Sequence, residues 1–225
     1  LFNYQRRKSS PVSIAQVPLG GSYPVRIQSM TNCSTLDTSC CVEQIKKIVA
    51  AGADYVRLTA QGSKEAENLG NIRREIRKQG VEVPLIADIH FNPSVAELAA
   101  SQVEKVRINP GNFADPLHIE PPRGKESDQV GTTVPEIEKQ KVRERLLPLL
   151  AICKKRGTAL RIGVNHGSLS SRMMLRYGDS PLGMVESCME YLRICAEEDF
   201  RQVVVSIKSS NTLAMIQTVR LLVKT

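Results

Sequence analysis

Polar and apolar residues alternate along several short segments of this chain, and a period of two is typical of β-strands. Five such segments carry charged or amide side chains toward their ends, at residues 54–59, 85–90, 106–109, 160–165 and 203–208. Side chains alternate between the two faces of a strand. The polar residues of each segment therefore share one face, and the Val, Leu and Ile residues share the other, which is expected to lie against helices.

Helical periodicity fills the stretches between these strands, and residues that favour helix starts mark several boundaries. Ser63, Asn92, Ser180 and Asn211 are expected at helix starts, two of them directly before a proline. Pro148 is expected to kink or restart the helix around it. We expect a first strand at 25–30 and helices at about 39–51, 63–80, 94–101, up to 157, 181–198 and from 211 onward.

One stretch departs from this regular alternation. Residues 113–140 are charged, contain four prolines and lack a clear period. We expect an insertion after the fourth strand, mobile in part. The rest of the 225 residues is predicted to form one domain.

Six β/α units follow from this pattern. Parallel strands joined by helices cross over right-handedly, which leaves a barrel or an open doubly wound sheet. No Gly-x-Gly-x-x-Gly follows any strand, and polar groups end successive strands without a switch point. We therefore expect an α/β fold of the TIM (β/α)8-barrel type, spanning residues 1–225, whose last two units lie outside this chain.

Composition narrows the class of ligand. The formal net charge is +8, but aromatic residues make up only 4% of the chain and Trp is absent. Nucleic-acid binders need stacking platforms or a basic stripe, whereas the cations here are scattered, so a small anion is the expected partner. The six cysteines form no C-x-x-C, which favours a reduced, cytosolic protein. No apolar run approaches membrane-spanning length.

Four of the inward-facing strand residues are cations. Arg57, Arg107, Arg161 and Lys208 are expected to share one cavity mouth with Asp88 as the obvious inward acid. Two like charges in close contact repel by roughly 4 kcal/mol at an intermediate dielectric. A phosphate or diphosphate ester would relieve this repulsion, and the planar guanidinium fork suits its oxygens.

Further polar residues complete the expected substrate-binding site, each with a structural alternative. An arginine in a strand can simply pair with a carboxylate, a lone histidine can be a satisfied core residue, and Asn112 can serve a turn instead. No metal-ligand spacing is present, so no metal site is expected. These further residues are Gln28, Asn32, His90, Asn109, Asn112, Asn165 and Ser206.

Four ordered motifs carry a resemblance to a known family. They read IQSMTN at 27–32, ADIHF at 87–91, RINPGN at 107–112 and RIGVN at 161–165. From about residue 6 to residue 224 the chain resembles the 4-hydroxy-3-methylbut-2-enyl diphosphate synthases of the methylerythritol phosphate route to isoprenoids. The segments at 113–115, 165–169 and 177–181 look like those of the long, three-domain variant.

The resemblance implies reductive opening of 2-C-methyl-erythritol 2,4-cyclodiphosphate. It assigns the diphosphate to six residues: Arg57, His90, Arg107, Arg161, Asn165 and Lys208. It also implies a 4Fe–4S cluster on a separate domain, ferredoxin or flavodoxin as electron donor, a homodimer, and a location in the bacterial cytoplasm or the plastid stroma. The cluster Cys-x-x-Cys and the following acid are absent here, so no catalytic residue is expected within this chain and the fragment alone should be inactive.

Two other functions stay open. One is a different phosphate-ligand barrel enzyme similar to dihydropteroate synthase, which also uses strand-end Asn, Arg and Lys. The other is a non-catalytic basic binding module, which would bind polyanions in a strongly salt-dependent way.

Overall fold

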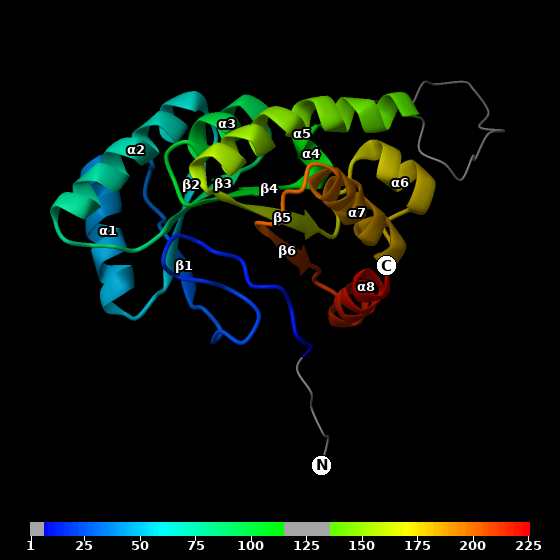
Figure 1. The fold of residues 1–225 in the computed structure, drawn as a ribbon, viewed down its shortest axis with the longest axis horizontal. Helices are drawn as coiled ribbons and strands as arrows, with labels where there is room; N and C mark the ends of the chain where they lie inside the picture. The colour runs from blue at the N-terminus through cyan, green and yellow to red at the C-terminus, as the bar shows by residue number, and fades with distance from the viewer. Residues whose placement is uncertain (1–6, 115–135) are drawn as a thin grey trace, which may run out of the picture.

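The structure, a computed structural model, describes residues 7–114 and 136–225 (Figure 1). Most of the insertion expected at 113–140 lies outside the described residues. At its edges, a short helix ends at residue 113 and a long helix begins at Glu136. The described elements are β1 (Gln28–Met30), α1 (Thr38–Ala50), β2 (Tyr55–Ala60), α2 (Ser63–Lys78), β3 (Leu85–Ile89), α3 (Pro93–Ala100), β4 (Lys105–Ile108), α4 (Pro110–Phe113), α5 (Glu136–Arg156), β5 (Ala159–Asn165), α6 (Ser171–Tyr177), α7 (Pro181–Glu197), β6 (Val203–Lys208) and α8 (Thr212–Lys224).

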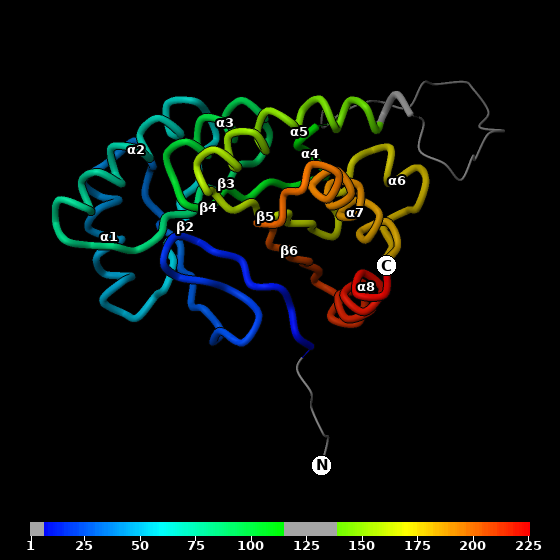
Figure 2. The backbone as a smooth tube through the Cα atoms, in the orientation of Figure 1, coloured from blue at the N-terminus to red at the C-terminus, as the bar shows by residue number. Residues whose placement is uncertain are grey.

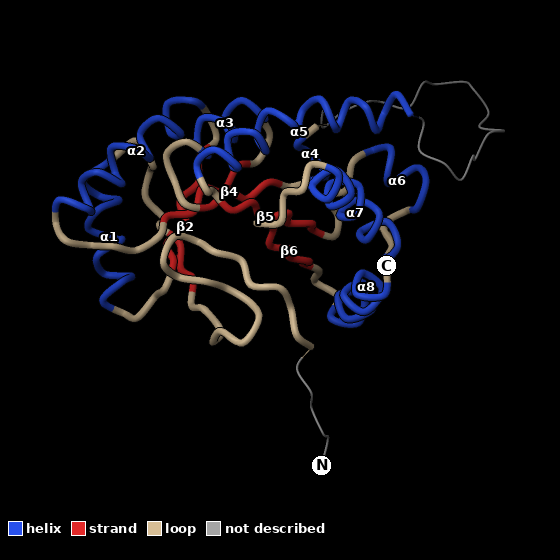
Figure 3. The backbone as a smooth tube through the Cα atoms, viewed as in Figure 1, coloured by secondary structure: helices blue, strands red, loops and turns tan. Residues whose placement is uncertain are grey.

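The sheet of the described residues is parallel throughout and follows the chain order β1-β2-β3-β4-β5-β6. In a doubly wound sheet the order of the strands reverses at a switch point, whereas the order of these strands does not reverse. The helices form an arc around the strands. The N-terminal segment, which comprises residues 7–27 before β1, crosses the open side of that arc (Figures 2 and 3). The described residues therefore form a curled six-stranded part of a TIM (β/α)8-type barrel, as the sequence predicts.

The main core lies between the strands and the helices. Val56, Leu58 and Ala60 of β2 are fully buried, and they belong to the same cluster as Ile45 of α1 and Leu69 of α2. The alternation expected from the sequence is confirmed here, because these residues occupy the face opposite to Arg57. We call the other face of the sheet, toward the barrel interior, the hollow face.

A second, smaller hydrophobic cluster covers the hollow face at the amino-terminal ends of the strands, which we call its lower end. Val12 and Ile14 of the N-terminal segment pack there with Tyr55, Ile86 and Ala159. The Tyr55 hydroxyl donates a hydrogen bond of 2.5 Å to a backbone carbonyl of the same segment, and residues 12 and 19 form an isolated antiparallel bridge. The N-terminal segment therefore covers the lower end of the hollow face.

Several helix boundaries match the expectations. Asn92, Ser180 and Asn211 each accept a backbone hydrogen bond as the N-cap residue. Gly52 closes the first helix at a φ of +92°, in the left-handed region. Helix α5 continues through Pro148 without restarting.

The expected cap at Ser63 is wrong. The N-cap of α2 is Gly62, and its backbone N–H donates to the Glu65 carboxylate at 3.1 Å. The glutamate at the third helical position accepts from the N-cap N–H, which is one half of a capping box, and glycine supplies no side-chain acceptor for the other half. Ser63 is the first residue inside the helix.

Three local features were not anticipated. Strand β1 begins at Gln28 instead of residue 25, because Val25 and Ile27 on this outermost strand are exposed. The short helices α4 and α6 lie in segments expected to be loops. Both are too short for a helical period to be visible in the sequence.

Candidate anion-binding site

Strand register places the predicted cations at neighbouring positions. Asp88 of β3 is in register with Arg107 of β4, which is in register with Arg161 of β5. Lys208 ends β6 in register with Asn165. All of these residues share the hollow face, at the carboxyl ends of the strands, where barrel enzymes bind their substrates.

Among the described residues, Asp88 supplies the carboxylate that lies next to these cations. Arg107 donates to it at 3.1 Å, and the Arg57 Nε lies 3.5 Å from its other oxygen. The His90 Nε2 lies 3.9 Å from Asp88 as well. Asp88 is only 4% exposed, so one buried carboxylate serves two arginines and faces one histidine.

Arg161 has no carboxylate partner among the residues described. Its Nε donates to the Ser206 hydroxyl at 2.9 Å, which satisfies one of its donors but leaves its charge unbalanced. Burial lowers the pKa of Arg161, and the charges of Arg57 and Arg107 lower it further.

Lys208 experiences the same cations. Partial burial lowers the pKa of Lys208, and Arg57, Arg107 and Arg161 add to that effect, while Asp88 opposes it. The four cations are therefore close enough to repel one another. Four positive charges face one negative charge, so the hollow face carries an excess of positive charge that an anion would stabilise.

Gly163 makes room for Arg107 on the hollow face. The Arg107 guanidinium donates to the Gly163 carbonyl at 3.0 Å. A Cβ atom built on Gly163 would lie 2.6 Å from the Arg107 Nε, closer than packing allows. Sequence analysis missed Gly163, although its place between Arg161 and Asn165 put it on the same strand face.

Two buried amides have unsatisfied oxygens. The Oδ1 atoms of Asn112 and Asn165 are buried without a hydrogen-bond partner in the described part of the chain, and so is the Nε of Arg57. Asn109 is different, because its side chain donates to Ser168 and caps α4. Buried polar atoms are rarely left unpaired, so these amides and Arg57 have hydrogen-bonding capacity to spare for a ligand.

The two candidates in and just after β1, Gln28 and Asn32, lie apart from the cations. Gln28 is in register with Tyr55, one layer below Arg57. Asn32 is exposed and exchanges hydrogen bonds with Gln44 of α1. The residue of β1 that reaches the cluster is Met30, whose sulfur lies 3.2 Å from an Arg57 nitrogen.

Lys105 is a cation that the sequence analysis also missed. It shares strand parity with Arg107 on β4, so the signal was present in the sequence. Its side chain is 2% exposed, and its Nζ lies 4.7 Å from the centroid of the Tyr55 ring. Burial lowers the pKa of Lys105 to about 7, with Arg161 and Arg57 contributing.

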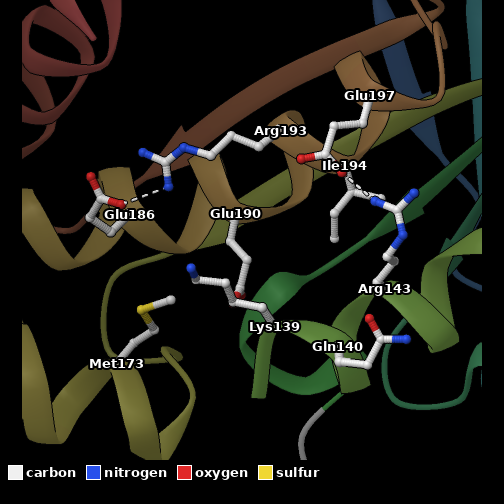
Figure 4. Close-up of a pocket in the computed structure, with 9 residues that line it drawn as sticks. All are labelled: Lys139, Gln140, Arg143, Met173, Glu186, Glu190, Arg193, Ile194 and Glu197. Carbon is white, nitrogen blue, oxygen red and sulfur yellow. Dashed lines mark hydrogen bonds and ion pairs between the residues drawn. The ribbon is translucent and has the colours of Figure 1, made fainter. Parts of the chain in front are cut away.

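A separate cavity of about 370 Å³ lies outside the sheet, between α5, α6 and α7 (Figure 4). Its charges are mutually neutralised: Arg193 pairs with Glu186 at 3.0 Å, and Arg143 pairs with Glu197 and Glu198. This cavity therefore lacks the excess positive charge that distinguishes the hollow face.

The cysteines do not form a ligand set for a metal cluster. Cys33 and Cys41 lie 3.5 Å apart beside α1, and three others are buried in the main core. Within 7–114 and 136–225 no three His, Cys, Asp or Glu side chains converge as a metal site requires. The same residues include no helix with the length and apolar character needed to cross a lipid bilayer.

Fold and site together define a β/α-barrel segment whose hollow face carries an excess of positive charge. The family description "GcpE TIM-barrel domain" matches residues 9–225, and the chain belongs to this family.

Curated relatives agree with this assignment. The chain is 59% identical to the 4-hydroxy-3-methylbut-2-en-1-yl diphosphate synthase (flavodoxin) of Phocaeicola vulgatus, over 100% of this chain and 36% of that protein. It is 60% identical to the enzyme of the same name from Bacteroides fragilis, over 99% and 35%. The chloroplastic, ferredoxin-dependent counterpart of Oryza sativa is 44% identical over 99% and 29%. The chain thus spans about a third of the length of these relatives.

Solved structures support the fold alone. A truncated 3-deoxy-D-arabino-heptulosonate 7-phosphate synthase from Thermotoga maritima superposes with a TM-score of 0.58 at 11% identity, covering 96% of this chain and 66% of that one. The 3-keto-D-glucoside 4-epimerase of E. coli gives a TM-score of 0.51 at 13% identity, covering 82% and 68%.

Proposed function

We propose that this chain is the substrate-binding barrel of a 4-hydroxy-3-methylbut-2-enyl diphosphate synthase, and that the hollow face binds 2-C-methyl-erythritol 2,4-cyclodiphosphate. One observation carries the proposal, namely four inward cations around Asp88, the one carboxylate that the described part of the chain places beside them. The cyclic diphosphate carries two negative charges, which would offset most of the net charge of +3 that these five side chains carry. The family match favours this function over the dihydropteroate synthase-like and binding-module alternatives.

The residues have distinct roles in this proposal. Arg161 and Lys208, which lack a carboxylate partner in the described residues, bind the phosphoryl oxygens directly. Arg57 and Arg107 are positioned by Asp88 and offer their remaining N–H groups. Asn165 and His90 lie at the rim, where they can hydrogen-bond the ligand.

The reaction that we infer for the full-length enzyme consumes two electrons. With two protons taken up alongside the two electrons, opening the ring and losing a hydroxyl group as water would yield an open-chain allylic diphosphate. A 4Fe–4S cluster would supply the electrons. We propose that its ligands lie in another part of the full-length enzyme, since this chain spans about a third of the length of its relatives. We further infer reduction by flavodoxin or ferredoxin, a homodimer, and a location in the bacterial cytoplasm or the plastid stroma, in line with the relatives' names.

Thermal stabilisation of the full-length protein by the cyclic diphosphate tests the proposal. Arg161→Ala and Lys208→Ala should each weaken binding by roughly tenfold to a hundredfold, because each removes a charge-assisted hydrogen bond. The ligand-induced increase in Tm should shrink accordingly. Matched controls are Arg201→Ala and Lys46→Ala, whose side chains are exposed on the outer surface. An unchanged increase in both site variants would refute the assignment.

A further inference from the structure

Lys105 is a buried lysine between the candidate anion site and the lower end of the hollow face. It lies on the hollow face of β4, two residues before Arg107. Its neighbours in register, Ile86 and Ala159, are apolar, and both belong to the cluster closed by the N-terminal segment. The aromatic ring of Tyr55 lies 4.7 Å from its Nζ. Lys105 is thus almost completely buried, with 2% of its surface exposed.

The charged groups that act on Lys105 are cations. Arg57 approaches from β2 and Arg161 from β5. From β3, the carboxylate of Asp88 is bound by Arg57 and Arg107, and Lys105 forms no ion pair in the part of the chain that is described. An isolated ammonium group in such surroundings is unfavourable.

We propose that Lys105 is a positioning residue that takes up a proton when an anion binds above it, between Arg57 and Arg161. This inference depends on the function proposed above. The ligand neutralises the guanidinium groups that repel an ammonium, so protonation of Lys105 becomes favourable. The positive charge of the protonated Lys105 then stabilises the bound anion electrostatically. Binding and protonation are reciprocally coupled, as linkage requires.

The size of the coupling can be estimated. Burial, with the charges of Arg161 and Arg57, holds the pKa of Lys105 at about 7 in the free protein, so the amine is mostly neutral at pH 8. If binding raises that pKa by about two units, linkage gives an uptake of about 0.8 proton per ligand at pH 8 and about a tenfold gain in affinity.

Isothermal titration of the full-length protein with the cyclic diphosphate at pH 8 measures this uptake. Repeating the titration in buffers of different ionisation enthalpy gives the number of protons bound. The ligand has one acidic hydroxyl per phosphorus and no group that titrates near neutral pH, so the uptake reports on the protein. Wild type should take up most of a proton, while Lys105→Met and Lys105→Gln should take up none and bind about tenfold more weakly.

His90 and Lys208 are further ionisable side chains beside the cluster. Both belong to the proposed binding site, so His90→Asn is expected to bind more weakly but to take up the same number of protons per bound ligand. The exposed-surface variant Lys46→Met is the neutral control, and it should change neither affinity nor uptake. A purely structural role for Lys105 would leave the uptake unchanged in both Lys105 variants, which overturns the inference. Binding without uptake in wild type overturns it too and leaves the proposed function standing. No binding to wild type overturns both.

Discussion

Gly163 shows how one residue without a side chain determines the shape of the candidate site. It lies between Arg161 and Asn165 on the hollow face of β5, and the space left by its missing Cβ holds the Arg107 guanidinium. Any larger residue would compete with that guanidinium for the same space.

Gly163→Ala should weaken binding of the cyclic diphosphate by roughly tenfold, because Arg107 must leave both Asp88 and the Gly163 carbonyl. Calorimetric titration of the full-length protein would measure the change. Gly70→Ala in α2 is the matched control, since its added methyl group meets only the flexible end of Gln102. Equal affinity in the Gly163 variant and the control would contradict the packing argument.

Lys105 makes stability depend on pH. Its pKa of about 7 in the folded protein is below its ordinary value of 10.5, so the unfolded chain binds more protons between these values. The cost of the buried charge is fully present below about pH 7 and is relieved as the pH rises toward 10.5. Lys105→Met should therefore stabilise the protein by roughly 3 kcal/mol at pH 6, with a smaller difference at higher pH.

Chemical denaturation at pH 6, 8 and 10 would measure this trend. Lys46→Met, on the exposed surface of α1, provides a comparison without a buried charge. A pH-independent difference between Lys105→Met and wild type would show that an acid already pairs with Lys105.

The side-chain period of two explains which site residues could be predicted. Arg57, Arg107 and Arg161 were placed on one face by parity alone, and the strand register brings them together. Parity could not reveal that Asp88 is shared by two arginines, because that depends on side-chain conformation. Lys105 was overlooked although its parity was the same, since its depth in the barrel depends on the N-terminal segment that covers it.

At the scale of elements, the loops after β4 and β5 act as one unit. Asn109 donates to the Ser168 hydroxyl at 3.1 Å, and a Cβ on Gly111 would lie 1.7 Å from the Ser168 carbonyl oxygen. The two backbones are therefore in direct contact. This contact holds α4 against the start of the loop that leads to α6.

Gly111→Ala should separate these two loops and lower the free energy of unfolding by roughly 2 kcal/mol, because a rigid backbone atom blocks the added methyl group. It should also weaken binding of the cyclic diphosphate, since Asn112 of α4 and Asn165 at the end of β5 lie on the two sides of this contact. Thermal unfolding with and without the ligand would measure both effects. An unchanged Tm would contradict the contact.

Sequence patterns located the long elements and most helix starts. Side-chain caps such as Asn92 and Asn211 are local signals, so they could be recognised without tertiary information. Helix α4 has the same kind of cap at Asn109, but its four residues are too few to show a helical period, and α6 is short and has no side-chain cap. The predicted strand β1 begins too early, at residue 25. The apolar residues Val25 and Ile27 fit a strand pattern, but they are exposed and precede the strand.

At the scale of the whole molecule, the N-terminal segment connects strands that are distant in the sequence. Ile14 is fully buried against β2, β3 and β5, and the Ser13 N–H donates to the Gln202 side chain before β6. This segment therefore stabilises the curvature of the sheet from its hollow side and keeps water away from Lys105.

Ile14→Ala should destabilise the protein by about 3 kcal/mol, the usual cost of a large-to-small change in a closed core. It should also let water reach Lys105, so the proton uptake on ligand binding should decrease. Denaturation and the calorimetric titration measure the two effects separately. Val25→Ala, at a side chain that is 75% exposed, should change neither.

The excess positive charge of the hollow face also has a practical consequence for crystallography. Crystals grown from ammonium sulfate should contain a sulfate ion between Arg161 and Lys208, because its tetrahedral oxyanion resembles a phosphoryl group. Density for such an ion would give a first experimental position for one phosphoryl group of the proposed ligand.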